Sequence, residues 1–173
     1  MFASPPPSDG QDGQSEEHPI HLEGVKAHDF RCFLKAFLPR PEWQGRLIMT
    51  DTELESALHL AKMRCFDRFQ SQLIEKLNNH NLRSSRKLQL ARIFDIQEWF
   101  GPELRLLALR SSNLTTEEWE ELGPKLTVVV SQLRDERYNA LLGSIKDWDP
   151  EDAEEHIHEA EDKVNEMLNE LLY

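Results

Sequence analysis

The sequence predicts a mainly α-helical fold with one short strand near its start. Apolar residues recur every three or four positions along most of the chain, which is the spacing of a helix with one buried face. Two Thr-x-x-Glu capping boxes, beginning at Thr50 and Thr115, mark helix starts, and proline or glycine follows several of the apolar patterns. With 173 residues, the chain is long enough to bury a core without disulfides.

The first elements are an arm, a strand and a helix. Residues 1–18 combine three consecutive prolines with Ser, Gly, Gln, Asp and Glu, so they are predicted to be a disordered loop or arm. The run Ile20-His21-Leu22-Glu23 is predicted to be a strand, and Gly24 follows it. A helix is predicted over Lys26–Leu38, where aromatic residues have helical spacing, and Pro39 ends it.

Four helices are predicted in the middle of the chain. The first begins at the Thr50 capping box, and the second extends from Phe66 to Leu77. The third covers Arg86–Phe94, and the fourth covers Pro102–Arg110 with proline in its first position. The apolar residues of these patterns form the predicted core, which comprises Phe30, Phe33, Leu58, Phe66, Phe69, Leu73, Leu90, Phe94 and Trp99.

Three helices are predicted in the last third of the chain. The Thr115 capping box opens a short helix, which Gly123-Pro124 ends. Lys125–Leu142 contains three consecutive valines that favour a strand, but its flanking leucines fit a helix better. Asp149-Pro150 combines a capping side chain with proline and therefore predicts the start of the last helix.

The formal charge of −12 is concentrated at the end of the chain. Residues 147–173 hold 11 acidic residues and one basic residue, which leaves the remainder with a net charge of only −2. An acidic tail on a nearly neutral body disfavours nucleic-acid binding, which depends on clustered Lys and Arg. The sequence also has no signal peptide and no long apolar run, so we expect no membrane association and an intracellular protein of the cytoplasm or nucleus.

The sequence predicts no catalytic residue, no cofactor and no metal site. Cys32 and Cys65 both lie in apolar patterns and are interpreted as small buried side chains. His156 and His158 lie among glutamates, but residues two apart on a helix point in different directions, so we expect two solvated histidines. A metal-binding or enzymatic protein that uses these histidines stays open as a less favoured alternative.

An ordered set of short motifs resembles a known family. The motifs are Pro19-Ile20-His21-Leu22-Glu23-Gly24-Val25-Lys26-Ala27-x-x-Phe30, Phe33-Leu34, Leu58-x-x-Ala61-x-x-x-x-Phe66-Asp67-Arg68-Phe69, Ile74-Glu75-Lys76-Leu77, Lys87-Leu88-x-Leu90-Ala91-Arg92-x-Phe94-Asp95-Ile96-x-Glu98-Trp99 and Leu114-Thr115-x-Glu117-Glu118-x-x-x-Leu122-Gly123. Together they resemble the second half of a fungal BTB/POZ domain and the helices after it. In that family two strands and a long helix precede this part, so the resemblance implies a truncated α+β module with one remnant strand.

The resemblance implies four segments and a role in protein interaction. These are the arm 1–18, the C-terminal half of a BTB/POZ-like domain at 19–80, a helical extension at 81–143 and an acidic amphipathic helix at 144–173. It implies an adaptor for protein partners, with roles in cullin-type ubiquitin ligases or transcription-regulator assembly. Homodimerisation is not expected, because the family's dimer surface draws on the absent half. A helical structural scaffold unrelated to this family is the leading alternative.

The candidate interaction residues are the apolar positions of the predicted strand and of the last helix. The last helix carries a heptad-like stripe that fits either docking on its own domain or binding a partner helix. The candidates are Ile20, Leu22, Ile157, Val164, Met167 and Leu171.

Overall fold

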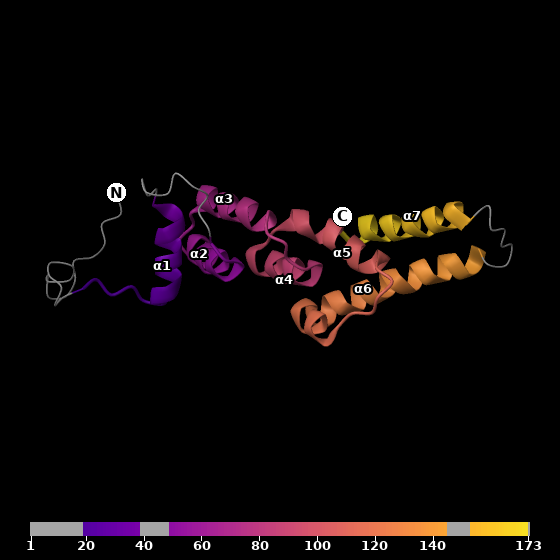
Figure 1. Cartoon of the computed structure of the whole chain (residues 1–173), viewed down its shortest axis with the longest axis horizontal. Coiled ribbons are helices and arrows are strands. Elements are labelled where there is room, and N and C mark those ends of the chain that lie inside the picture. The colour runs from indigo at the N-terminus through magenta and orange to yellow at the C-terminus, as the bar shows by residue number, and fades with distance from the viewer. Residues whose placement is uncertain (1–18, 39–48, 145–152, 173) are drawn as a thin grey trace. The chain divides into compact units, whose positions relative to one another are not determined.

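The computed structural model describes residues 19–38, 49–144 and 153–172, and within them the fold is helical. The chain divides into two compact units, residues 1–79 and 80–173 (Figure 1). The first unit contains α1 (Ala27–Phe37), α2 (Asp51–Met63) and α3 (Asp67–Asn78). The second contains α4 (Ser84–Phe94), the 3₁₀ turn η1 (Gln97–Trp99), α5 (Phe100–Leu109), α6 (Thr116–Ser144) and α7 (Ala153–Leu172).

In the first unit, α2 packs against both α1 and α3. The apolar faces that the spacing predicts meet there, and Phe33, Leu58 and Leu73 are buried as expected. The Thr50 capping box forms: Glu53 N–H donates to Thr50 Oγ1 at 3.2 Å, and Thr50 N–H donates to Glu53 Oε2 at 2.9 Å. Lys35 of α1 also donates to Glu53 Oε1 at 2.7 Å, so one carboxylate fixes the start of α2 and joins it to α1.

The predicted strand at Ile20–Glu23 is not confirmed. In the described residues no segment pairs with it, and the chain instead turns at Glu23-Gly24, where Val25 N–H donates to the Leu22 carbonyl at 3.3 Å. A strand is stable only when a neighbour accepts and donates its backbone hydrogen bonds. The mainly helical class is therefore correct, and the α+β component is absent from the described part.

Two residues of the predicted core lie at the surface of the first unit. Phe30 and Phe66 are both exposed, whereas Phe69 is half-buried. Phe66 precedes the first turn of α3, and Phe30 lies in the first turn of α1, so each is at a helix end where only one neighbour can cover it. Helical spacing identifies a face but not how far along a helix its neighbours extend.

Cys65 is exposed, which contradicts its expected burial. It follows α2 in the left-handed conformation (φ 56°), and Phe66 N–H then donates to the Ala61 carbonyl at 2.9 Å. This is the hydrogen bond of a Schellman motif, in which glycine is the usual residue at the left-handed position. Cys32 is buried as expected.

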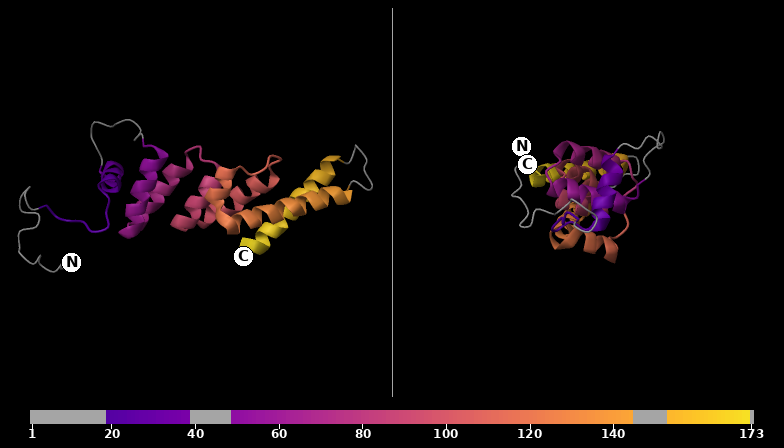
Figure 2. Two further views of the ribbon diagram at one scale, coloured as in Figure 1. Left: turned by 90° about the horizontal axis from the view of Figure 1, so that it is seen from below. Right: turned by 90° about the vertical axis from the view of Figure 1, so that its left-hand side faces the viewer.

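In the second unit, α6 and α7 run side by side, and α5 packs against both (Figures 1 and 2). α4 packs against α5 and α6. Phe94, Leu90 and Trp99 are buried, as predicted. A core cluster of this unit draws on α4, α5, α6 and α7 and comprises Leu88, Leu104, Leu107, Ala108, Leu122, Val130, Leu133, Val164 and Leu168.

The last helix packs within its own unit. Val164 is completely buried, Leu168 is nearly so, and Met167 packs against the same cluster. Arg105 of α5 also lies 3.5 Å from the Glu161 carboxylate. Of the apolar candidates on α7, Ile157 is exposed, and the side chain of Leu171 lies outside the described residues.

A break divides α6 into two helical segments. Gly123 has φ 68° and ψ 174°, a conformation that only glycine adopts readily, and Pro124 follows it. The valine-rich stretch after the break is helical, as its flanking leucines predict. The predicted helix start at Asp149-Pro150 and the arm 1–18 lie outside the described residues. Among the helices that the structure describes, none is long and apolar enough to cross a membrane.

Candidate interaction groove

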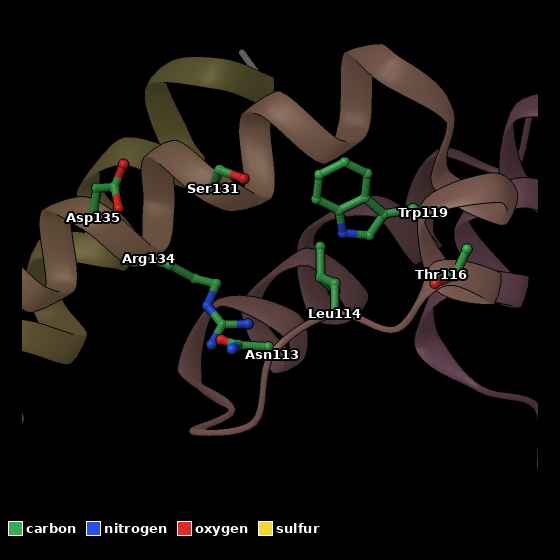
Figure 3. Close-up of a pocket in the computed structure, with 7 residues that line it drawn as sticks. All are labelled: Asn113, Leu114, Thr116, Trp119, Ser131, Arg134 and Asp135. Carbon is green, nitrogen blue, oxygen red and sulfur yellow. The ribbon is translucent and has the colours of Figure 1, made fainter.

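Two adjoining hollows on the second unit share the side chains of Arg134 and Asp135. The first hollow has a volume of about 550 Å³. Its residues come from the loop before α6 and from both segments of that helix (Figure 3). They are Asn113, Leu114, Thr116, Trp119, Ser131, Arg134 and Asp135. The second hollow, of about 340 Å³, continues along α6 and is lined by Ala108, Arg110, Ser111, Arg134, Asp135, Arg137, Tyr138 and Leu141. We call the two hollows together the α6 groove.

The start of α6 is fixed by its capping box. Glu118 N–H donates to Thr115 Oγ1 at 3.3 Å, and Thr115 N–H donates to Glu118 Oε2 at 2.8 Å. These reciprocal bonds satisfy backbone groups that a helix start otherwise leaves unpaired. They hold the loop that carries Asn113 and Leu114 against the first turn of α6.

Arg110, at the end of α5, binds both the capping-box glutamate and the loop before α6. Its guanidinium donates to both oxygens of the Glu118 carboxylate, at 2.7 and 2.8 Å, and also to the Asn113 carbonyl at 3.2 Å. Glu118 is buried, and the hydrogen bonds from Arg110 lower its pKa to about 2 against the cost of desolvation. The same bonds raise the pKa of Arg110. The loop between α5 and α6 is thus closed by a charged pair that stays ionised at neutral pH.

The break at Gly123 places Trp119 beside the second segment of α6. Arg92 of α4 donates to the Glu121 carbonyl at 3.0 Å, just before the break. Arg83 donates to the carboxylates of Glu117 and Glu121, at 2.8 and 2.9 Å, so α4 holds the short segment at two further points. Figure 3 shows the indole of Trp119 beside Leu114 and directed toward the part of α6 that carries Ser131.

The two aromatic side chains of the α6 groove are exposed. Trp119 retains 55% of its accessible surface and Tyr138 retains 63%. Large aromatic side chains usually bury more of their surface in a core, and exposed ones gathered in a hollow are typical of binding surfaces. Arg134 lies between them and donates to the Ser112 carbonyl at 2.9 Å, which fixes its position along the wall of the groove.

Three basic residues in and just before α4 contact neighbouring helices of the second unit. Besides the bonds of Arg83 and Arg92, Lys87 forms an ion pair with Glu103 of α5 at 3.1 Å, and its ammonium lies 5.9 Å from the ring centre of Trp99. The partners of these three residues in the structure are glutamates and a carbonyl of neighbouring helices.

Of the sequence candidates, Ile20 and Leu22 are exposed in the first unit, whereas Val164 and Met167 pack in the core of the second. The structure therefore does not bring the six candidates together on one surface. His158 is exposed and lies 4.0 Å from the Asp162 carboxylate. Within the described ranges, no three His, Cys, Asp or Glu side chains gather in a way that would hold a metal ion.

The first unit carries an aromatic cluster of its own. Phe33 stacks on Phe37 with ring centres 5.4 Å apart, and Phe66 and Phe69 meet both rings at 5.2 to 5.9 Å. Phe33 is buried, but Phe37 and Phe66 are exposed, so the cluster is covered on one side only. Offset and edge-to-face contacts of this kind stabilise the junction of α1 with α3.

Comparison with protein-family models, with curated proteins and with solved structures found no match for this chain. The assignment of a role therefore depends on the residues and surfaces described above.

The sequence candidates do not include the α6 groove. Trp119, Arg134 and Tyr138 are absent from them, because those candidates lie on the predicted strand and on the last helix. One signal was available: Trp119 is four residues before Gly123-Pro124, where a helix must turn and can expose one side of its last residues. That the turn brings Trp119 next to Ser131 depends on the tertiary contacts of α4.

Proposed function

We propose that this chain is a non-enzymatic protein-interaction module, an adaptor similar to the BTB/POZ-type proteins whose motifs it resembles. The observation that carries the proposal is the half-exposed indole of Trp119 in the α6 groove, next to the fixed guanidinium of Arg134. A Trp or Arg side chain in a hollow is the type of residue that contributes most to binding in protein interfaces.

The absence of catalytic chemistry is part of the proposal, and the chemistry of the two cysteines supports it. Burial raises the pKa of the Cys32 thiol, which makes it a poor nucleophile at neutral pH. Cys65 is exposed, but its backbone conformation serves the end of α2. Recruitment of substrates to a cullin-type ubiquitin ligase and assembly of transcription regulators are the two adaptor roles that the resemblance suggests.

The test is a quantitative affinity purification from the cells that express the protein, with three matched forms of the full chain. The forms are the wild type, Trp119→Ala and Val128→Ala, since Val128 is exposed to the same extent as Trp119 but is not among the residues that line the groove. We expect at least one partner to be retained by the wild type and by Val128→Ala and to be lost from Trp119→Ala. Partners that are unaffected by both substitutions would contradict a role for the groove.

A further inference from the structure

The α6 groove has the charge of a site for an acidic ligand, although the chain as a whole is acidic. In the described part of the chain, neither Arg134 nor Arg137 forms an ion pair, and Asp135 is the one carboxylate among the residues that line the groove. The third arginine of the groove, Arg110, is neutralised by Glu118. The groove therefore keeps a local excess of positive charge.

Arg134 keeps most of its donor capacity for a ligand. Its hydrogen bond to the Ser112 carbonyl uses one of the five N–H groups of a guanidinium and leaves the charge uncompensated. A carboxylate is the acceptor that such a fixed guanidinium binds best, because it accepts two parallel bonds. The bulk negative charge of the protein does not prevent this, because salt screens interactions beyond about 8 Å at physiological ionic strength.

The two aromatic residues set the length of the ligand. Ser131, which lies next to Trp119 in the first hollow, and Tyr138, in the second, are seven residues apart on a continuous helix. That spacing corresponds to about 10 Å along the helix axis. A polyproline II segment covers nearly the same distance in three residues, at about 3.1 Å each, and its three residues per turn bring the side chains of positions i and i+3 to the same side.

Resting on the proposed function, we propose that the α6 groove binds a short polyproline II segment of a partner protein with two apolar residues three positions apart and an acidic residue between them. One apolar side chain lies beside Trp119 and Leu114, and the other lies beside Tyr138 and Leu141. The carboxylate binds the guanidinium groups of Arg134 and Arg137. A long polyanion such as nucleic acid is not the occupant, because its binding depends on many clustered Lys and Arg side chains, and the groove holds two arginines, Arg134 and Arg137, that form no ion pair within the described residues.

The test measures fluorescence anisotropy of labelled eight-residue peptide pools with the full chain. In the acidic pool, Leu, Ile, Phe, Trp or Pro occupies two positions three apart, and Glu occupies the two positions between them. The basic pool has Lys in place of Glu, and the anchorless pool has Ser in place of the apolar residues. We expect only the acidic pool to bind, and we expect the affinity to fall ~10-fold for Trp119→Ala and for Tyr138→Ala.

Two variants separate the charge from the apolar contacts. Arg137→Glu is expected to weaken the acidic pool ~10-fold and to improve binding of the basic pool, whereas Val128→Ala leaves both unchanged. If Trp119→Ala abolishes binding but Arg137→Glu does not weaken it, the groove is a docking site, but the proposed acidic residue of the ligand is wrong. If no pool binds at about 1 mM, or if the basic pool binds equally well, the proposal is overturned.

A second copy of the chain as occupant is a separate outcome of the same experiment. Light scattering of the unlabelled protein detects self-association, and a dimer that Trp119→Ala disrupts would replace the peptide as the occupant. A partner that is lost from Trp119→Ala in affinity purification, together with no binding of any pool, would retain the proposed function and overturn only this inference.

Discussion

Arg110 and Glu118 form a bidentate contact in the second unit: both carboxylate oxygens accept from one guanidinium, at 2.7 and 2.8 Å. The same carboxylate accepts from Thr115 N–H in the capping box. The pair thereby connects the end of α5, the loop that lines the groove and the first turn of α6. Lys35 and Glu53 form the same arrangement in the first unit, so each capping-box glutamate also binds a basic residue of the preceding helix.

Glu118→Gln should destabilise the second unit by about 2 kcal/mol. The amide keeps the shape of the side chain but loses one acceptor and the charge opposite Arg110, which leaves a partly buried guanidinium without its partner. Urea unfolding followed by circular dichroism measures the change. Glu120→Gln is the control, since Glu120 is exposed on the same helical turn. Equal stability of the two variants would show that the contact contributes nothing.

Acid should weaken the second unit through the same carboxylate. The pKa of Glu118 is about 2 in the folded chain and 4.5 ordinarily, so its stabilising contribution is complete above pH 5 and is lost as the pH falls toward 2. That contribution is about 2 kcal/mol after allowance for the partial exposure of Arg110. The free energy of unfolding should therefore fall over this range in the wild type and fall less in Glu118→Gln. Parallel pH profiles would contradict the assignment.

Cys65→Gly should stabilise the first unit by about 0.5 kcal/mol. Cys65 has a positive φ of 56°, which costs an ordinary residue about 1 to 2 kcal/mol, and glycine removes this cost but gains flexibility in the unfolded chain. Alanine also has a Cβ atom, so Cys65→Ala keeps the backbone strain at this positive φ and should not raise the free energy of unfolding. The midpoints of urea unfolding in reducing buffer compare the three forms, and a loss of stability in Cys65→Gly would show that the thiol contributes to packing.

Gly123→Ala should destabilise the second unit by about 2 kcal/mol. The backbone there has φ 68° and ψ 174°, which an L residue with a side chain adopts only under strain. The added Cβ would also lie 3.0 Å from Nη1 of Arg92, so this guanidinium, whose Nη2 donates to the Glu121 carbonyl, would have to shift slightly. Gly24→Ala is the comparison, because its φ is also positive but its Cβ would meet nothing within 4 Å. The larger loss, measured by urea unfolding, is expected at Gly123.

Leu168→Ala should destabilise the chain by about 2 to 4 kcal/mol, because it opens a cavity where α7 packs into the core of the second unit. Ile157→Ala, on an exposed position of the same helix, should change stability by less than about 0.5 kcal/mol. Thermal unfolding of both variants measures the difference. If Leu168→Ala has the smaller effect, α7 does not dock in solution.

Local signals in the sequence predict most of the helices. Both capping boxes form as expected, and the leucines around Val128–Val130 correctly indicate a helix. The strand at Ile20–Glu23 is not confirmed, because strand formation depends on a partner that local sequence does not specify. The apolar neighbours of Cys65 predict a buried side chain, but Cys65 has a positive φ, a conformation that glycine usually adopts, and composition does not indicate this.

The α6 groove required tertiary information. Its walls come from the loop after α5 and from two helical segments that Gly123 sets at an angle, and the contacts of Arg83, Arg92 and Arg110 fix that angle. None of these contacts follows from residue spacing, since the partners lie 8 to 38 residues apart. Periodicity predicts which side chains turn inward, and it does not predict that tertiary packing leaves Trp119 exposed in a hollow.

The central claim is that the side chain at position 119 contacts a partner protein. Site-specific photo-cross-linking tests it most directly, with a benzophenone amino acid at position 119 in one form and at position 128 in another. We predict a covalent adduct with the same partner in repeated experiments from position 119 and none from position 128. Equal cross-linking from both positions, or none from either in cells that express the protein, would contradict the account.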